Sequence, residues 1–262
     1  MPRGRTSHLT PVAATFAKKS ANPLPLHDDF SLPRRAFAAL SITTAAGLLA
    51  VHVARLIAAS DSFHWFVPLA VIGGMIAADF LSGLIHWSAD TWGSESMPFI
   101  GRRFLHPFRV HHVNPDDFLR RRFVDTNGDV AFLVVPILVA AYFIPLGAAA
   151  QLTVVIFVTS FCGIGLLTNQ VHQWAHMTEP PCVVKALQEC GAILGRNAHA
   201  RHHRPPYAVN YCIATGWCNR PLAAVNFFRR LERMVTRVTG WQPRSDDVVF
   251  QSDVETRCQA NA

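Results

Sequence analysis

The chain has 262 residues, half of them hydrophobic and only 16% charged, with a formal net charge of +7. This length suits one sizeable domain, and so apolar a composition indicates a membrane protein rather than an ordinary soluble domain. No basic stripe with interleaved aromatic residues appears, so we expect no nucleic-acid partner; basic charge beside long apolar runs suits a membrane surface.

The two ends of the chain differ in composition from its middle. Residues 1–35 carry Pro, Ser, Lys and Arg, and no hydrophobic core of a secretory signal peptide follows the basic residues. We therefore predict a disordered basic N-terminal tail over residues 1–35. Residues 36–250 are predicted to form one membrane-embedded domain, and residues 251–262 a C-terminal tail.

Long apolar segments occupy most of the first two thirds of the chain. Ala36–Leu56 and Phe63–Trp87 each reach the ~20 residues that a membrane-spanning helix needs. The apolar stretch from Val130 to Leu167 is about twice that length and is interrupted by Pro145 and Gly147, which indicates two spans joined by a tight turn. The predicted fold is all-α and multi-pass, with four transmembrane helices in two hairpins.

The distribution of Lys and Arg predicts the orientation. The links within the hairpins, "ASDSFH" and "PLGAAAQ", contain neither residue. The basic residues lie almost entirely in the N-terminal tail, between Asp90 and Asp129, and after His176. By the positive-inside rule these three regions are cytoplasmic, so both termini and a histidine-rich cap are expected on that side. An Ala- and Arg-rich chain without an organelle signal suggests a bacterial inner membrane.

The segment Val225–Val238, near the end of the chain, alternates basic and apolar residues at roughly helical spacing. Two interpretations are open. An amphipathic helix there could lie along the membrane surface, or it could pack with its apolar face on the cytoplasmic cap.

Eight of the 13 histidines lie in four short motifs. "GLIHWSAD" has HxxxD spacing, "FRVHHVNP" has adjacent histidines, "NQVHQWAH" has HxxxH spacing and "NAHARHH" has HxxHH spacing. Residues four apart share one helix face, so such pairs can bind one ion. The predicted metal ligands are His86, Asp90, His111, His112, His172, His176, His199, His202 and His203. The isolated histidines His8, His27, His52 and His64 are interpreted as ordinary core or surface residues.

Nine donors favour a two-metal site. One zinc ion usually takes four ligands, whereas two metals with four or five ligands each would use the whole set. In "HQWAH", Gln173 stands where a zinc protease has its glutamate base. The ExxH ligands of soluble di-iron bundles are lacking, and haem needs only one or two axial histidines. Imidazole suits iron, so we expect two Fe ions that use O₂ and an external electron donor to attack an unactivated C–H bond.

Ligating histidines need acceptors that fix their tautomers. Asn169, Gln170, Asp116 and Asp129 are candidates for this role. The motif "TNGD", which contains Asp129, is interpreted first as a turn and helix cap before Val130.

Several longer segments together carry a family resemblance. They are "ADFLSGLIHWSADTWGS", "PFRVHHVNP", "VDTNGD", "TNQVHQWAH", "HARHH" and "YCIATGWCNRPL". These segments resemble the Kua/CarF lipid desaturase family, which includes the plasmanylethanolamine desaturases and a plant plastid fatty-acid desaturase, and the resemblance covers residues 63–247. It implies that residues 36–250 are a lipid desaturase domain and that the nine donors named above are its iron ligands. It places no ligand at His106.

The resemblance also implies an activity. The expected reaction is O₂-dependent desaturation of the 1-O-alkyl chain of an ether phospholipid, plasmanylethanolamine, to the vinyl ether of a plasmalogen. A carrier such as cytochrome b5 or ferredoxin would donate the electrons. No catalytic residue beyond the metal ligands is expected, and no substrate-binding residue is assigned. Seven arginines could bind the lipid phosphate or the acidic surface of an electron donor, or they could reflect the positive-inside rule alone. They are Arg102, Arg103, Arg120, Arg121, Arg122, Arg201 and Arg204.

Two alternative functions stay open. One is an acyl-lipid desaturase or hydroxylase that acts at another chain position. The other is a non-catalytic membrane protein that binds metal or takes part in signalling.

Overall fold

The computed structural model describes residues 26–59, 65–204 and 207–244. Within these ranges every regular element is a helix and no strand occurs. The predicted C-terminal tail, residues 251–262, lies outside the described residues, as do residues 1–25 of the predicted N-terminal tail.

Four long helices form the body of the molecule. Each is long and apolar enough to cross a membrane, which confirms the four predicted spans. They are α1 (Leu32–Ala59), α2 (Phe66–Thr91), α5 (Phe123–Tyr142) and α6 (Ala149–His176).

Helix α5 begins earlier than the sequence suggested. The motif "VDTNGD" forms its first two turns instead of a turn before Val130. Asp125 accepts hydrogen bonds from Arg35 at 2.9 and 3.2 Å, and Asp129 pairs with Arg103 at 2.8 Å. Acidic residues also interact favourably with a helix N-terminus. These contacts outweigh the turn propensity of the motif.

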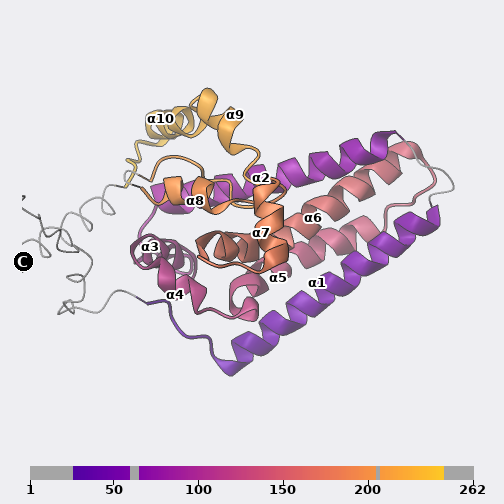
Figure 1. Cartoon of the computed structure of the whole chain (residues 1–262), viewed down its shortest axis with the longest axis horizontal. Coiled ribbons are helices and arrows are strands. Elements are labelled where there is room, and N and C mark those ends of the chain that lie inside the picture. Colours follow the sequence, from indigo (N-terminus) through magenta and orange to yellow (C-terminus); the bar gives the residue numbers. More distant parts are fainter. Residues whose placement is uncertain (1–25, 60–64, 205–206, 245–262) are drawn as a thin grey trace, which may run out of the picture.

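The two hairpins are nested rather than placed side by side. Helix α1 packs on α5, α5 on α6, and α6 on α2, so the α5–α6 hairpin lies between the two helices of the other hairpin (Figure 1). The C-terminal ends of α2 and α6 therefore meet at one end of the bundle, and this end carries the cap.

In the described part of the chain, seven short helices from two stretches of sequence cover that end of the bundle (Figure 1). They are the π-helix η1 (Gly101–Leu105), α3 (His106–Val113), α4 (Pro115–Leu119), α7 (Cys182–Glu189), α8 (Arg196–His202), α9 (Asn219–Ala224) and α10 (Phe227–Thr239). The histidine-rich cap expected from the sequence is thus present.

Helix α10 is the amphipathic segment for which two interpretations were open. Its Phe228 is buried against Trp87 and Tyr211, with ring centroids 5.8 and 4.8 Å away. Glu232, also buried, accepts a hydrogen bond from the indole of Trp87 at 3.3 Å. These contacts support the interpretation of a helix packed on the cap.

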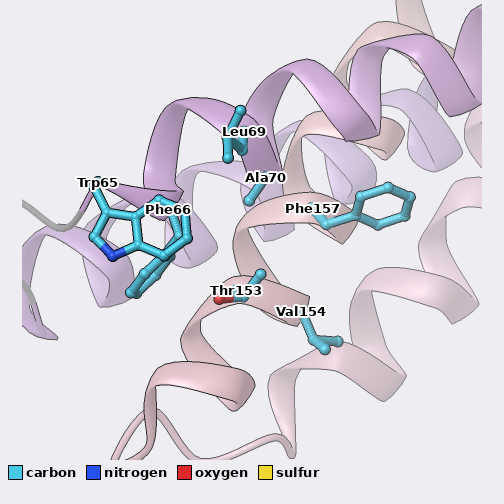
Figure 2. A pocket seen from close by; sticks show the side chains of 7 residues that line it. All are labelled: Trp65, Phe66, Leu69, Ala70, Thr153, Val154 and Phe157. Carbon is cyan, nitrogen blue, oxygen red and sulfur yellow. The ribbon is translucent and has the colours of Figure 1, made fainter.

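An apolar pocket of about 450 Å³ lies between α2 and α6 at the opposite end of the bundle. Its lining comes from the first turns of both helices and from the residue before α2 (Figure 2): Trp65, Phe66, Leu69, Ala70, Thr153, Val154 and Phe157. At a rise of 1.5 Å per residue, Leu69 is roughly 25 Å along α2 from His86. The pocket is therefore remote from the histidine motifs.

Close packing of α1 on α5 depends on Gly128, and this yields a first prediction. A Cβ atom at Gly128 would lie 2.3 Å from Cβ of Ala38, whereas at Gly163 it would meet nothing within 4 Å. Alanine normally stabilises a helix by about 1 kcal/mol relative to glycine. We expect Gly163→Ala to raise or preserve the thermal unfolding temperature in detergent and Gly128→Ala to lower it. Equal unfolding temperatures would contradict this packing.

Candidate metal centre

Four elements bring the predicted ligands to one place at the cap end of the bundle. His86 and Asp90 lie in the last turns of α2, and His172 and His176 in the last turns of α6. The remaining ligands come from the cap: His111 and His112 on α3, His199 and His202 on α8, and His203 at the end of α8. All nine predicted donors fall into two groups, within each of which the ligand atoms lie within 4.8 Å of one another.

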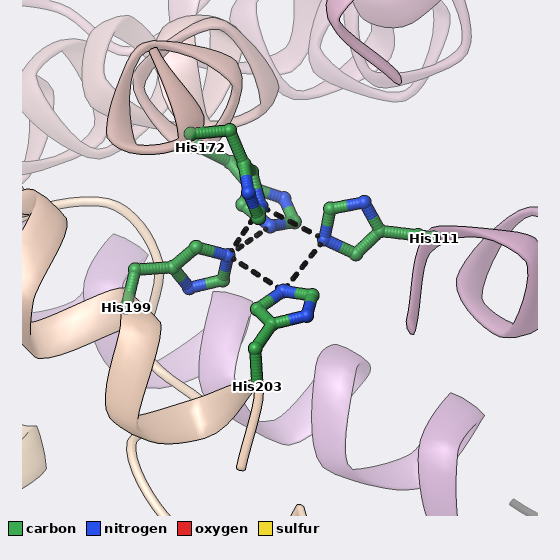
Figure 3. A group of neighbouring side chains, drawn as sticks. His111, His172, His199 and His203 are labelled. Carbon is green, nitrogen blue, oxygen red and sulfur yellow. Dashed lines mark hydrogen bonds between the residues drawn. The ribbon is translucent and has the colours of Figure 1, made fainter. Parts of the chain in front are cut away.

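The first group, the five-histidine group, consists of His111, His172, His176, His199 and His203. The Nε2 atom of His199 lies 2.9 Å from Nε2 of His172, 2.6 Å from that of His176 and 3.0 Å from that of His203. Figure 3 shows the labelled rings of this group pointing their nitrogens toward one another.

These contacts are too crowded to be ordinary hydrogen bonds. A neutral imidazole carries one N–H, so a single Nε2 atom cannot be satisfied by three other ring nitrogens. Lone pairs that converge in this way repel one another unless a cation lies between them. Imidazole nitrogens are good ligands for iron and zinc, so the donor set fits a transition metal.

The second group, the carboxylate group, consists of His86, Asp90, His112 and His202, and all four are buried. Oδ2 of Asp90 lies 3.3 Å from Nε2 of His86 and 3.5 Å from Nε2 of both His112 and His202. The Nε2 atoms of His112 and His202 are 3.1 Å apart. Three imidazoles and one carboxylate around a common centre also suit a transition metal.

Backbone carbonyls fix two rings of the carboxylate group. Nδ1 of His86 lies 3.1 Å from the carbonyl oxygen of Tyr211, and Nδ1 of His202 lies 2.8 Å from that of Val209. A carbonyl only accepts hydrogen bonds, so each Nδ1 must carry the hydrogen. The lone pair on each Nε2 is then directed at the centre of the group.

The side chains predicted to support the ligands are used elsewhere. Asn169 donates to the carbonyl of Thr126 at 2.6 Å and Gln170 donates to Gln173 at 3.1 Å. Asp116 is exposed, and Asp129 forms the ion pair described above. The carbonyls of Val209 and Tyr211 could not be predicted from the sequence. Every residue has a backbone carbonyl, and residue identity does not indicate which carbonyl accepts a hydrogen bond from a ligand.

Aromatic side chains surround the two donor groups. Their presence there was not predicted from the sequence. The ring of Phe118 lies 5.1 Å from the rings of both His111 and His172. Tyr207 stacks on His112 with centroids 4.8 Å apart and planes 10° apart, and Phe108 lies 5.3 Å from His86. These rings help to exclude water from the ligands.

Burial keeps three histidines of the cap neutral. Desolvation, together with neighbouring histidines, holds the pKa of His111, His199 and His203 well below its usual range. Neutral rings are the form that binds metal, so these ligands are ready at neutral pH without losing a proton.

The isolated histidines that the structure describes, His27, His52 and His106, lie outside both groups. Nε2 of His52 lies 2.9 Å from the carbonyl of Leu138, and Nδ1 of His106 lies 2.9 Å from Glu95. His27 contacts Asp117. His8 and His64 fall outside the described residues.

The arginines of the cap are partly neutralised. Arg102, Arg103 and Arg120 each form an ion pair with an aspartate at 2.6–2.8 Å. Ion pairing within the cap therefore accounts for several of the basic residues that the sequence offered as phosphate ligands.

Comparison with known proteins gives consistent matches. The profile of the lipid desaturase domain family matches residues 75–246. The chain is 38% identical to plasmanylethanolamine desaturase of Myxococcus xanthus, over 85% of this chain and 79% of that protein. It is 40% identical to plasmanylethanolamine desaturase 1 of Mus musculus, over 72% of each chain. It is 36% identical to the chloroplastic fatty acid desaturase 4 of Arabidopsis thaliana, over 75% of this chain and 61% of that protein. No solved structure matches.

The lowered histidine pKa values predict how stability depends on pH. In the unfolded chain these rings take up protons near pH 6.5, whereas in the folded protein His111, His199 and His203 stay neutral to much lower pH. The unfolded state therefore binds more protons, and stability falls as the pH drops below about 6.5. We expect chelator-treated protein to unfold at a lower temperature at pH 5.5 than at pH 7.5.

A variant provides the control for this pH dependence. His199→Gln removes one buried titrating ring, so the difference between the two unfolding temperatures should shrink. An unfolding temperature that rises on acidification would contradict the account.

Proposed function

Because the chain belongs to the lipid desaturase family, we propose that it is a plasmanylethanolamine desaturase, which forms the vinyl-ether bond of plasmalogens from the 1-O-alkyl chain of an ether phospholipid. One observation carries the proposal: nine donors from four separated segments meet in two groups at one end of a membrane-spanning bundle. Two metal sites side by side suit a desaturase better than a single structural ion would.

We assign one iron ion to each donor group. Eight imidazoles and one carboxylate favour iron over the oxygen-seeking cations Mg²⁺ and Ca²⁺. With O₂, two protons and two electrons from an external donor, two iron ions bound there would supply the oxidant that removes one hydrogen from each of two adjacent carbons, leaving an alkene and two water molecules.

The protein holds the ligands in place and keeps out water. The carbonyls of Tyr211 and Val209 orient His86 and His202, which are 1% and 0% exposed. Phe108, on α3, covers the ring of His86. A dry, fixed donor set also limits side reactions with stray reductants.

The position of the donor groups suits this substrate. The bond that becomes a vinyl ether is next to the ether oxygen, and hence only a few ångströms below the headgroups. His86 and His176 lie at the ends of α2 and α6, where spanning helices leave the apolar layer. A lipid can therefore present this carbon to the metals without a deep channel.

The surroundings of the enzyme follow from charge placement. Among the described residues, nearly all Lys and Arg lie at the cap end, which supports a cytoplasmic cap and cytoplasmic termini. The Ala- and Arg-rich composition favours a bacterial inner membrane. A soluble or membrane-bound carrier such as cytochrome b5 or ferredoxin would deliver electrons from that side. Residues 36–250 are assigned to the catalytic domain and the two ends of the chain to tails.

An acyl-lipid desaturase is the second candidate, since the Arabidopsis relative is named a fatty acid desaturase. The two products differ chemically, because a vinyl ether releases an aldehyde in acid and an ordinary alkene does not. Expression in a host that lacks plasmalogens, supplied with alkyl-ether lipid, should produce acid-released aldehyde. New alkenes without aldehyde would favour the second candidate, and bound metal without any O₂-dependent change in lipid would favour a non-catalytic protein.

The same assay tests the ligands. We expect His172→Ala and His203→Ala to abolish aldehyde release without loss of the protein from the membrane, because each removes a donor from the five-histidine group. His106→Ala should keep most activity, since His106 bonds to Glu95 outside both groups. Full activity in either ligand variant would contradict its assignment.

A further inference from the structure

Helix α2 carries a second buried carboxylate besides Asp90. Asp79 lies two turns before His86 and is 0% exposed. It belongs to neither donor group. An ionisable side chain inside a membrane span is costly and is kept where it has a function, and metal binding does not supply one for Asp79.

The contacts of Asp79 are all with one stretch of backbone. Its Oδ1 atom accepts the N–H groups of Ala214, Thr215 and Gly216 at 3.2, 2.8 and 2.8 Å. Its Oδ2 atom accepts the N–H of Cys218 at 2.9 Å. A carboxylate has only acceptor sites, so it satisfies four donors that no neutral side chain could satisfy together.

The next turn of α2 continues this contact. The hydroxyl of Ser82 accepts the N–H of Ile213 at 3.1 Å. Gly83 lets the backbone approach, because a Cβ atom there would lie 2.4 Å from Sγ and 3.3 Å from Cα of Cys212. The facing segment therefore runs antiparallel to α2: positions later in α2 contact residues that come earlier in the segment.

The segment ends at the metal ligands. Its carbonyls at Tyr211 and Val209 bond to Nδ1 of His86 and His202. Both rings belong to the carboxylate group. A shift of the segment along α2 would remove these acceptors and release both rings.

We propose that Asp79 is a positioning residue that sets the register of residues 209–218 along α2 and so orients His86 and His202. It acts on the carboxylate group, while the five-histidine group keeps its own geometry. That this group holds iron rests on the proposed function; the anchoring of the segment does not.

The test replaces Asp79 by asparagine, which keeps the shape but turns one acceptor oxygen into an NH₂ donor. Whichever way the amide lies, it faces at least one backbone N–H without accepting from it. In metal-free Asp79→Asn we expect amide hydrogens of residues 212–218 to exchange about tenfold faster, as for the loss of roughly one hydrogen bond. In the purified enzyme, iron should fall from two ions per chain toward one.

Two further variants serve as a control and as a milder substitution. Asp125→Asn changes another carboxylate, whose side chain is 2% exposed and pairs with Arg35. This variant should leave exchange in residues 212–218 and iron content unchanged. Ser82→Ala, a milder change, should speed exchange in the same segment to a smaller extent, and it serves if Asp79→Asn does not fold.

The outcomes separate the two proposals. Unchanged exchange in residues 212–218, or loss of both irons in equal measure, would overturn the role of Asp79. Faster exchange in this segment together with an iron-free but folded wild-type protein would support the anchor and refute the di-iron function.

Discussion

The central constraint on this structure is a set of imidazole nitrogens that face one another. They carry too few N–H groups to form hydrogen bonds among themselves, so their lone pairs repel. In the five-histidine group, His199 alone faces three other Nε2 atoms at 2.6–3.0 Å. Neutral imidazoles cannot satisfy one another in this arrangement, and burial prevents water from doing so. A cation bound there would convert the same arrangement from unfavourable to favourable, and metal binding would then be coupled to folding of the cap.

The nested bundle explains how four distant segments deliver these donors. With the α5–α6 hairpin between α1 and α2, the last turns of α2 and α6 lie at the same end of the bundle, and their histidines meet those of the cap. Helix α2 then does more than span the membrane. Along one helix, Asp79 and Ser82 hold the backbone of the facing segment, and His86 receives a carbonyl from it. The middle of α2 thus helps to fix the segment whose carbonyl orients His86 near the end of the same helix.

Hydropathy predicted the four spans, and the spacing of rare residues singled out the nine side chains that the structure gathers in two groups. Sequence reasoning placed the start of α5 too late, since "TNGD" has turn propensity and the ion pair between Asp125 and Arg35 comes from a segment 90 residues away. It also missed backbone acceptors such as the carbonyl of Tyr211, which have no side-chain signature. Asp79 is an acidic residue within an apolar span, a pattern that indicates a functional role and could have been recognised from the sequence.

The most direct test of the central claim is elemental analysis combined with Mössbauer spectroscopy of active, purified wild-type protein and of two variants, His199→Ala and His202→Ala. Two iron ions per chain in the wild type are expected, in environments that differ because one donor group contains a carboxylate. Each variant should lose the signal of its own site first. Active protein without iron, or with a single iron environment that both variants remove, would contradict the account.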